Sequence, residues 1–119
     1  MKTYHGNCHC GAVKFSFDHD EITQGVRCNC SICKRKGAVM SPFTIKPEDL
    51  VIEAEDNMLG NYRFGSKVAH HYFCKQCGIY PFHQTLRNPG EYRVNLGCID
   101  DVDIYSLDIR VFDGKSLPA

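Results

Sequence analysis

The sequence predicts an all-β domain of about eight short strands, in which bound metal stabilises the fold together with a modest hydrophobic core. Segments of alternating apolar and polar residues recur along the chain, and no stretch shows the sustained 3.6-residue periodicity of a long helix. Seven of the eight cysteines fall into three close groups. A length of 119 residues suffices for one small core, and no repeat or linker interrupts it. We therefore expect residues 1–119 to form a single domain.

The first half of the chain is expected to contain three strands and two helical turns. Residues 12–18 alternate between apolar and polar and predict a half-buried strand. A second strand over 22–27 would lead directly into a group of cysteines. Residues 34–36 finish a short helical turn that a glycine ends, and 46–50 begin another with a proline and two acidic residues, as helix N-termini favour. Between these turns, 38–45 is predicted to be a strand with its proline at an edge or a bulge.

The second half is expected to contain five further strands. Residues 59–64 and 68–73 lie on either side of a Gly-Ser turn, and the second of them runs into a cysteine pair. Residues 79–85 and 91–96 flank an Asn-Pro-Gly turn, which is typical of paired strands. The segment 107–112 alternates strongly and predicts the last strand.

Charge and targeting signals restrict the class of function. Lysine plus arginine and aspartate plus glutamate each total 14, so the formal net charge is zero. This balance argues against a protein that binds nucleic acid through its overall charge. No segment has signal-peptide or bilayer character, which favours a cytoplasmic location without a membrane partner. Thiols stay reduced there, so we expect metal ligands or reactive thiols rather than the four bridges of a secreted disulfide scaffold.

Two cysteine pairs that lie far apart in the sequence predict a closed metal site. Cys8 and Cys10 form a C-x-C motif, and Cys74 and Cys77 form a C-x-x-C motif. Four thiolates at ~2.3 Å complete a tetrahedral zinc site, which would tie the first part of the chain to its middle. Gly78 fits the tight turn after the second pair because glycine readily takes a positive φ. The spacing leaves open two alternatives, namely four unliganded thiols or a pairing of the first motif with the cysteine group described next.

Cys28, Cys30 and Cys33 supply three sulfurs within six residues and predict a second metal site. Its fourth position is either open to water or substrate, as in catalytic zinc sites, or closed by another side chain, as in structural ones. The spacing does not decide between these alternatives. The candidate closing ligands are Cys98, His5, His9, His70, His71 and His83.

A basic stretch at 34–36 directly follows this group, and Arg27 precedes it. Beside a metal site such a stretch favours a negatively charged ligand such as a carboxylate, whereas elsewhere it would be an ordinary solvated surface. His71 either orients a group near a site or is a half-buried, hydrogen-bonded strand residue. Cys98 fits equally well as a small core residue.

Four segments in this order, GNCHCGAVKF, CNCSICK, HYFCKQCGI and VNLGCID, resemble the glutathione-dependent formaldehyde-activating enzyme family, which includes centromere protein V. The last two segments look closer to the centromere-protein-V branch. The resemblance extends from Gly6 to Asp101 and implies a β-tent fold of short antiparallel strands with two zinc ions, one structural and one catalytic. By the family pattern, the structural zinc would bind Cys8, Cys10, Cys74 and Cys77, and the catalytic zinc would bind Cys28, Cys30 and Cys33.

The resemblance also implies a carbon–sulfur lyase of the S-(hydroxymethyl)glutathione synthase type. A zinc-held thiol, from glutathione or a similar molecule, would attack formaldehyde or another small aldehyde. The competing hypothesis is a non-catalytic zinc module that binds a protein or nucleic-acid partner. A second zinc held by three protein sulfurs would favour the enzyme, and one held by four protein ligands would favour the module.

Overall fold

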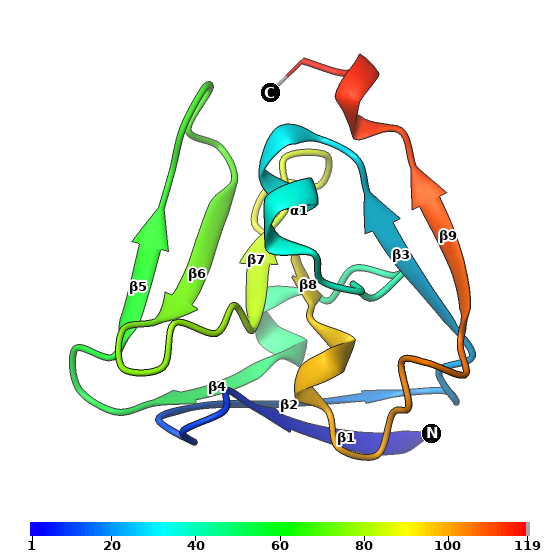
Figure 1. Cartoon of the computed structure of the whole chain (residues 1–119). Coiled ribbons are helices and arrows are strands. Elements are labelled where there is room, and N and C mark those ends of the chain that lie inside the picture. The colour runs from blue at the N-terminus through cyan, green and yellow to red at the C-terminus, as the bar shows by residue number, and fades with distance from the viewer. Residues whose placement is uncertain (119) are drawn as a thin grey trace.

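The computed structural model describes residues 1–118 (Figure 1). In this part of the chain the backbone forms nine strands, one short α-helix and three 3-10 helices. In chain order they are β1 (Lys2–Asn7), β2 (Val13–His19), β3 (Gln24–Cys28), α1 (Ser31–Lys36), η1 (Pro47–Asp49), β4 (Val51–Ala54), β5 (Leu59–Tyr62), β6 (His70–Cys74), β7 (Phe82–Gln84), β8 (Tyr92–Val94), η2 (Leu96–Cys98), β9 (Asp108–Phe112) and η3 (Gly114–Ser116). None of the described helices is both long and apolar enough to cross a bilayer.

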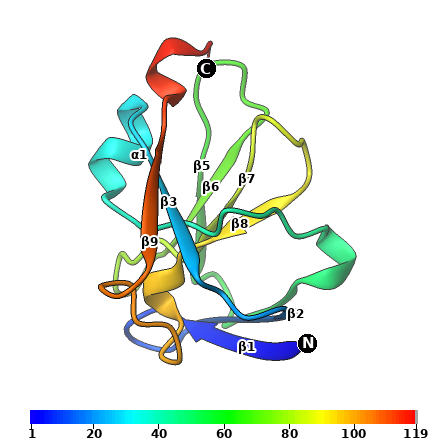
Figure 2. The same ribbon diagram turned by 90° about the vertical axis from the view of Figure 1, so that its right-hand side faces the viewer.

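The strands form three separate sheets. β1, β2 and β4 make an antiparallel sheet, β5 to β8 make a four-stranded antiparallel sheet, and β3 pairs with β9. In Figure 1 the β1-β2-β4 sheet lies along the bottom, and above it β5 and β6 lie to the left of α1 and β3 and β9 to its right. The turned view in Figure 2 shows β3 and β9 side by side. η3 continues from the end of β9 at the top of Figure 1.

A continuous apolar core joins the bottom sheet to the four-stranded sheet. Val13, Phe15 and Phe17 are buried and alternate with exposed or partly buried residues along β2, as expected for a strand with one face in the core. The ring of Phe15 meets that of Phe82 edge-on, with centroids 5.8 Å apart. Gly6 lies opposite Phe15, whose ring occupies the space that a Cβ at position 6 would need. This close approach fixes how β1 packs on β2.

The all-β class is confirmed, and seven of the eight expected strands are present within the described residues. The expected strand over 38–45 is wrong: this segment makes only isolated bridges, at Met40 and Ile45. Pro42 lies between those bridges and has no N–H for a ladder, so the segment crosses from β3 to β8 instead of pairing continuously. β1 and β4 are strands that the sequence pattern did not predict. The pairing of β3 with β9 is parallel, unlike the antiparallel arrangement expected throughout.

Candidate metal centres

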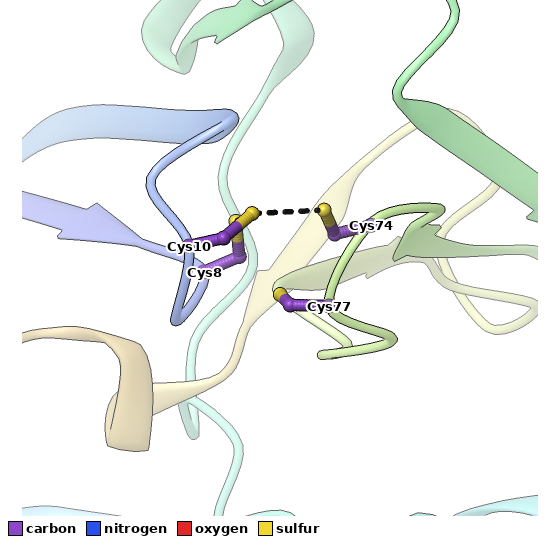
Figure 3. Close-up of side chains that lie close together, drawn as sticks. All are labelled: Cys8, Cys10, Cys74 and Cys77. Carbon is purple, nitrogen blue, oxygen red and sulfur yellow. Dashed lines mark hydrogen bonds between the residues drawn. The ribbon is translucent and has the colours of Figure 1, made fainter.

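Two separate clusters of cysteines lie within residues 1–118, and both are consistent with zinc sites. The first contains Cys8, Cys10, Cys74 and Cys77, whose sulfurs all lie within 4.8 Å of one another. Figure 3 shows these four side chains converging from two parts of the chain, one just after β1 and one at the end of β6. All eight cysteines are free thiols, so no disulfide joins either cluster.

The sulfur separations in this four-cysteine cluster fit tetrahedral zinc. The Sγ of Cys10 lies 3.7 Å from that of Cys8 and 3.6 Å from that of Cys74. A tetrahedron with metal–sulfur bonds of ~2.3 Å places its sulfurs about 3.8 Å apart. Gly78 takes the expected positive φ of 77°, and its N–H donates to the carbonyl of Cys74 at 2.8 Å, which closes the turn around the second pair. The cluster is therefore shaped for one ion, and it pairs the first cysteine motif with the last.

The second cluster contains Cys28, Cys30 and Cys33, again with sulfurs within 4.8 Å of one another. Cys28 ends β3, Cys30 is the N-cap of α1, and Cys33 lies in the first turn of that helix. Within residues 1–118, no fourth Cys, His, Asp or Glu donor joins this three-cysteine cluster. Cys98, a candidate fourth ligand, is buried, with its Sγ 3.9 Å from the carbonyl of Tyr80.

The thiols of the three-cysteine cluster favour a cation among them. Burial raises the pKa of Cys30, but the backbone N–H groups of Cys33 and Ile32 and the neighbouring thiols lower it, and the net shift is downward. Burial and hydrogen bonding to Cys30 raise the pKa of the Cys33 thiol well above its ordinary value. Three thiolates this close repel one another, and a divalent cation is the usual way to hold them deprotonated together.

A cavity of about 550 Å³ opens beside the three-cysteine cluster, and Cys28, Cys30 and Cys33 all line it. No residue of the four-cysteine cluster lines this cavity. Most of its wall is apolar, with side chains such as Ile32, Phe64 and Phe112. A largely apolar cavity with a few polar groups is typical of a small-molecule site.

The charged side chains that line the cavity are all basic: Arg87, Arg93 and Lys115. No acidic residue within 1–118 lines it. Arg93 is half-buried, and its Nη1 donates to the carbonyl of Ser41 at 2.8 Å. These three residues were not identified from the sequence because they come from the loop after β7, from β8 and from η3, which only the tertiary fold brings together.

The basic stretch at 34–36 does not have the single role expected of it. Lys34 and Arg35 are exposed and do not line the cavity, whereas Lys36 points inward. The Nζ of Lys36 lies 2.6 Å from Nδ1 of His71 and 3.5 Å from the centroid of the Tyr80 ring. Burial lowers the pKa of Lys36 to about 8, although the cysteines of the neighbouring cluster oppose this shift. At pH 7 a group with this pKa is mostly in its ammonium form.

Two of the histidines considered as ligands, His71 and His83, line the cavity without joining the sulfurs. Both are buried, and their ring centroids lie 5.5 Å apart. Burial, followed by the charge of Lys36, lowers the pKa of His71 to about 4. The same causes lower the pKa of His83 well below its ordinary value. Both imidazoles are therefore neutral at physiological pH. His5, His9 and His70 neither join a cysteine cluster nor line the cavity.

The C-terminal residues complete the wall around the three-cysteine cluster. A Cβ built on Gly114 would lie 2.5 Å from Sγ of Cys28, so only glycine permits this approach. The side chain of Asn29 fixes the segment, because its Nδ2 donates to Asp113 at 3.0 Å and its Oδ1 accepts the N–H of Lys115 at 2.8 Å. Nothing in the local sequence signals this contact between residues so far apart in the chain.

The fold and the two clusters define a small, mostly β protein with a closed set of four sulfurs and an open set of three. Residues 3–114 match the family described as glutathione-dependent formaldehyde-activating enzyme, and the chain belongs to this family. It is also similar to a Rhodobacter sphaeroides protein of known crystal structure. The two are 35% identical, with a TM-score of 0.78 over 89% of this chain and 99% of the other.

Proposed function

We propose that this protein is a zinc-dependent carbon–sulfur lyase that resembles S-(hydroxymethyl)glutathione synthase. It would add the thiol of glutathione, or of a similar small molecule, to formaldehyde or another small aldehyde. One observation carries this proposal: the three-cysteine cluster faces the 550 Å³ cavity and the four-cysteine cluster does not. The family description supplies the substrate class. Eight free thiols suit a cytoplasmic location, and residues 1–119 would act as one domain.

The two clusters would divide structural and catalytic roles. Cys8, Cys10, Cys74 and Cys77 would hold a structural zinc, because they offer four sulfurs at tetrahedral separations. Cys28, Cys30 and Cys33 would hold a catalytic zinc, because they leave one coordination position free for a ligand from the cavity.

The protein's own groups determine where the reacting sulfur lies. Zinc bound by the three-cysteine cluster would supply the divalent charge that keeps an incoming thiol deprotonated. The end of β3 and the first turn of α1 fix the three cysteines, so the thiolate is presented to the cavity. Its sulfur attacks the carbonyl carbon, a C–S bond forms, and the π electron pair moves to oxygen. The proton lost by the thiol returns through solvent to that oxygen and gives the S-hydroxymethyl product.

The basic side chains of the cavity favour an anionic thiol. Glutathione carries two carboxylates, and arginine binds carboxylates with two parallel hydrogen bonds. Arg87, Arg93 and Lys115 are the cations available on the cavity wall. A thiol without a carboxylate would lose this attraction, so we expect it to bind less tightly.

The test is the rate at which the zinc-loaded protein forms the S-hydroxymethyl adduct from ¹³C-labelled formaldehyde, followed by NMR above the uncatalysed rate. We expect acceleration with glutathione, less with cysteamine, which has no carboxylate, and none with the Cys30→Ser variant. A protein with two bound zinc ions and no acceleration for any thiol would contradict the proposal. That outcome would favour a non-catalytic module for a protein or nucleic-acid partner.

A further inference from the structure

Four polar side chains behind the three-cysteine cluster form a connected group that the proposed thiol chemistry does not yet use. They are Lys36 of α1, His71 of β6, His83 of β7, and Tyr80, which precedes β7. Lys36 contacts His71 and lies over the ring of Tyr80, and Tyr80 Oη contacts Nδ1 of His83. His71 and His83 line the same cavity as the three cysteines.

The contact with Lys36 determines which nitrogen of His71 carries the proton. An ammonium has three donors and no acceptor, so Nζ of Lys36 donates and Nδ1 of His71 accepts at 2.6 Å. A neutral imidazole that accepts at Nδ1 must carry its proton on Nε2. His71 is therefore held as the Nε2–H tautomer, a hydrogen-bond donor on the cavity wall.

The contact with Tyr80 has the same consequence for His83. The phenol of Tyr80 is buried, and burial raises its pKa well above the ordinary value, so it keeps its proton. A buried hydroxyl that does not donate is left with an unsatisfied proton, which costs ~1–3 kcal/mol. Tyr80 therefore donates to Nδ1 of His83, which leaves His83 with its proton on Nε2.

We propose that the Nε2–H groups of His71 and His83 bind the carbonyl oxygen of the aldehyde and stabilise the negative charge that develops on it when the thiolate attacks. Lys36 and Tyr80 are positioning residues, which act by holding the two imidazoles in the donor tautomer. This inference rests on the proposed function, because it assigns a partner to the oxygen of the same addition. In the step itself the sulfur supplies the electron pair of the new C–S bond, and the carbonyl π pair becomes a lone pair on oxygen. Both histidines keep their protons, and solvent protonates the product oxygen.

Neutral donors suit this position. Burial and the Lys36 charge keep the pKa of His71 near 4, so the ring stays neutral and does not compete with zinc for the thiolates. The two ring centroids are 5.5 Å apart, so both imidazoles lie at the same part of the cavity wall. Preorganised donors of this kind, placed where charge develops, are worth about 10²–10³ in kcat for each donor removed in known enzymes.

The first test reads the tautomer directly and does not depend on activity. Long-range ¹H–¹⁵N spectra of the zinc-loaded, histidine-labelled protein should show His71 with a protonated Nε2 and an unprotonated Nδ1 at neutral pH. In Lys36→Met the same ring should shift to a mixture of tautomers. A wild-type His71 protonated on Nδ1 would overturn the inference, and an unchanged tautomer in Lys36→Met would overturn the positioning role of Lys36.

The second test measures turnover. His71→Phe, which keeps a ring but has no donor, should lower kcat ~10²-fold while leaving the KM for the thiol and the zinc content unchanged. His71→Gln, whose side-chain amide can still donate, should recover most of that loss. His70→Phe is the matched control, because His70 is the neighbouring residue on β6 and does not line the cavity. It should keep the wild-type kcat.

The outcomes separate this inference from the function on which it rests. If the zinc-loaded wild-type protein forms no adduct, the proposed function fails, and the catalytic role of the two histidines fails with it. If the wild type is active and His71→Phe keeps its kcat, only the present inference is overturned. Loss of zinc in His71→Phe would show that this side chain supports the metal site instead. That result would also overturn the inference that His71 binds the carbonyl oxygen.

Discussion

The two cysteine clusters use the same ligand atom in opposite surroundings. In the four-cysteine cluster, Cys8 and Cys74 are fully buried, whereas Cys77 is partly exposed and Cys10 is exposed, and none of the four lines the cavity. In the three-cysteine cluster all members are partly exposed, and they face a cavity with basic and imidazole groups on its wall. The number of sulfurs alone would suggest that the four-cysteine cluster is closed and the three-cysteine cluster open. Their positions add that the four-cysteine cluster lies where two sheets meet, and that the three-cysteine cluster lies beside a cavity that a small molecule can enter.

The largest expected effect is the difference between one substitution in each cluster. Cys77→Ser should lose the ion that joins the two sheets, and structural zinc contributes ~10 kcal/mol or more of apparent binding free energy, so the domain should unfold. Cys30→Ser should lose one zinc and all activity but remain folded, because the core does not depend on that cluster. Circular dichroism and the zinc content of both variants check this. If both unfold, or both stay folded with one zinc, the division between the clusters is wrong.

A smaller effect is expected where the C-terminal segment contacts the three-cysteine cluster. In Gly114→Ala the new methyl group would lie 2.5 Å from Sγ of Cys28 and push that sulfur out of position. Displacing a ligand in this way should weaken zinc binding at the three-cysteine site ~10- to 100-fold, as loss of a supporting contact does in other metal sites. Competition with a chelator would measure it, and the zinc of the four-cysteine cluster should be unaffected.

Gly97→Ala is the matched control for this substitution, since Gly97 also lies in a 3-10 helix and a methyl group added there would have no neighbour closer than 3.2 Å. Equal chelator sensitivity of the two variants would show that the contact with Cys28 does not constrain the site.

Acid should affect the cavity side of the molecule through His71. Its pKa is about 4 in the folded protein and about 6.5 when unfolded, so the unfolded chain binds more protons between these values. The free energy of unfolding therefore falls as the pH falls through this window, by up to about 2 kcal/mol between pH 6.5 and 5. Denaturant unfolding of the wild type and of His71→Gln at both pH values isolates this contribution, because acid-driven loss of zinc is common to both. Parallel pH dependences would contradict it.

The smallest expected effect concerns the cations of the cavity. Exposed charge pairs contribute ~1 kcal/mol or less each, so Arg87→Ala with Lys115→Ala should raise the KM for glutathione less than about tenfold per residue and leave kcat unchanged. The effect should weaken at high salt. Lys34→Ala with Arg35→Ala removes the same charge from α1, away from the cavity, and should change neither constant. A larger rise in KM in the variant with Lys34→Ala and Arg35→Ala would show that glutathione binds at the basic stretch of α1 instead.

The sequence was sufficient to predict the elements whose signals are local. The alternation in β2, the helical turn ended by Gly37, and the grouping of seven cysteines all follow from spacing within a few residues. β1 was missed because only one of its two buried residues, Tyr4, has a large side chain, the other being Gly6. β4 was missed because most of its residues are exposed, so it shows no alternating pattern. Pro42 explains why an apolar segment forms bridges rather than a strand.

The rest of the site could not be predicted because distant segments build it. Arg87, Lys115 and Gly114 reach the cavity through loops and turns whose direction no local pattern encodes. His83 was considered only as a possible zinc ligand, whereas His71 was also considered as a residue that orients a group near a site or as a half-buried strand residue. Their contacts with Lys36 and Tyr80, which indicate a different use, depend on how α1 packs on the four-stranded sheet.

The parallel pairing of β3 with β9 has a consequence for the order in which the molecule is assembled. Just beyond the paired strands Asn29 contacts Asp113, 84 residues away, whereas the four-cysteine cluster is complete once Cys77 has been synthesised. Contacts between such distant segments form late because a long loop must close first. During synthesis the proposed structural zinc could bind while the far wall of the cavity does not yet exist. The four sulfurs of the first cluster are thus all present in a nascent chain before the segments that form the far wall of the cavity.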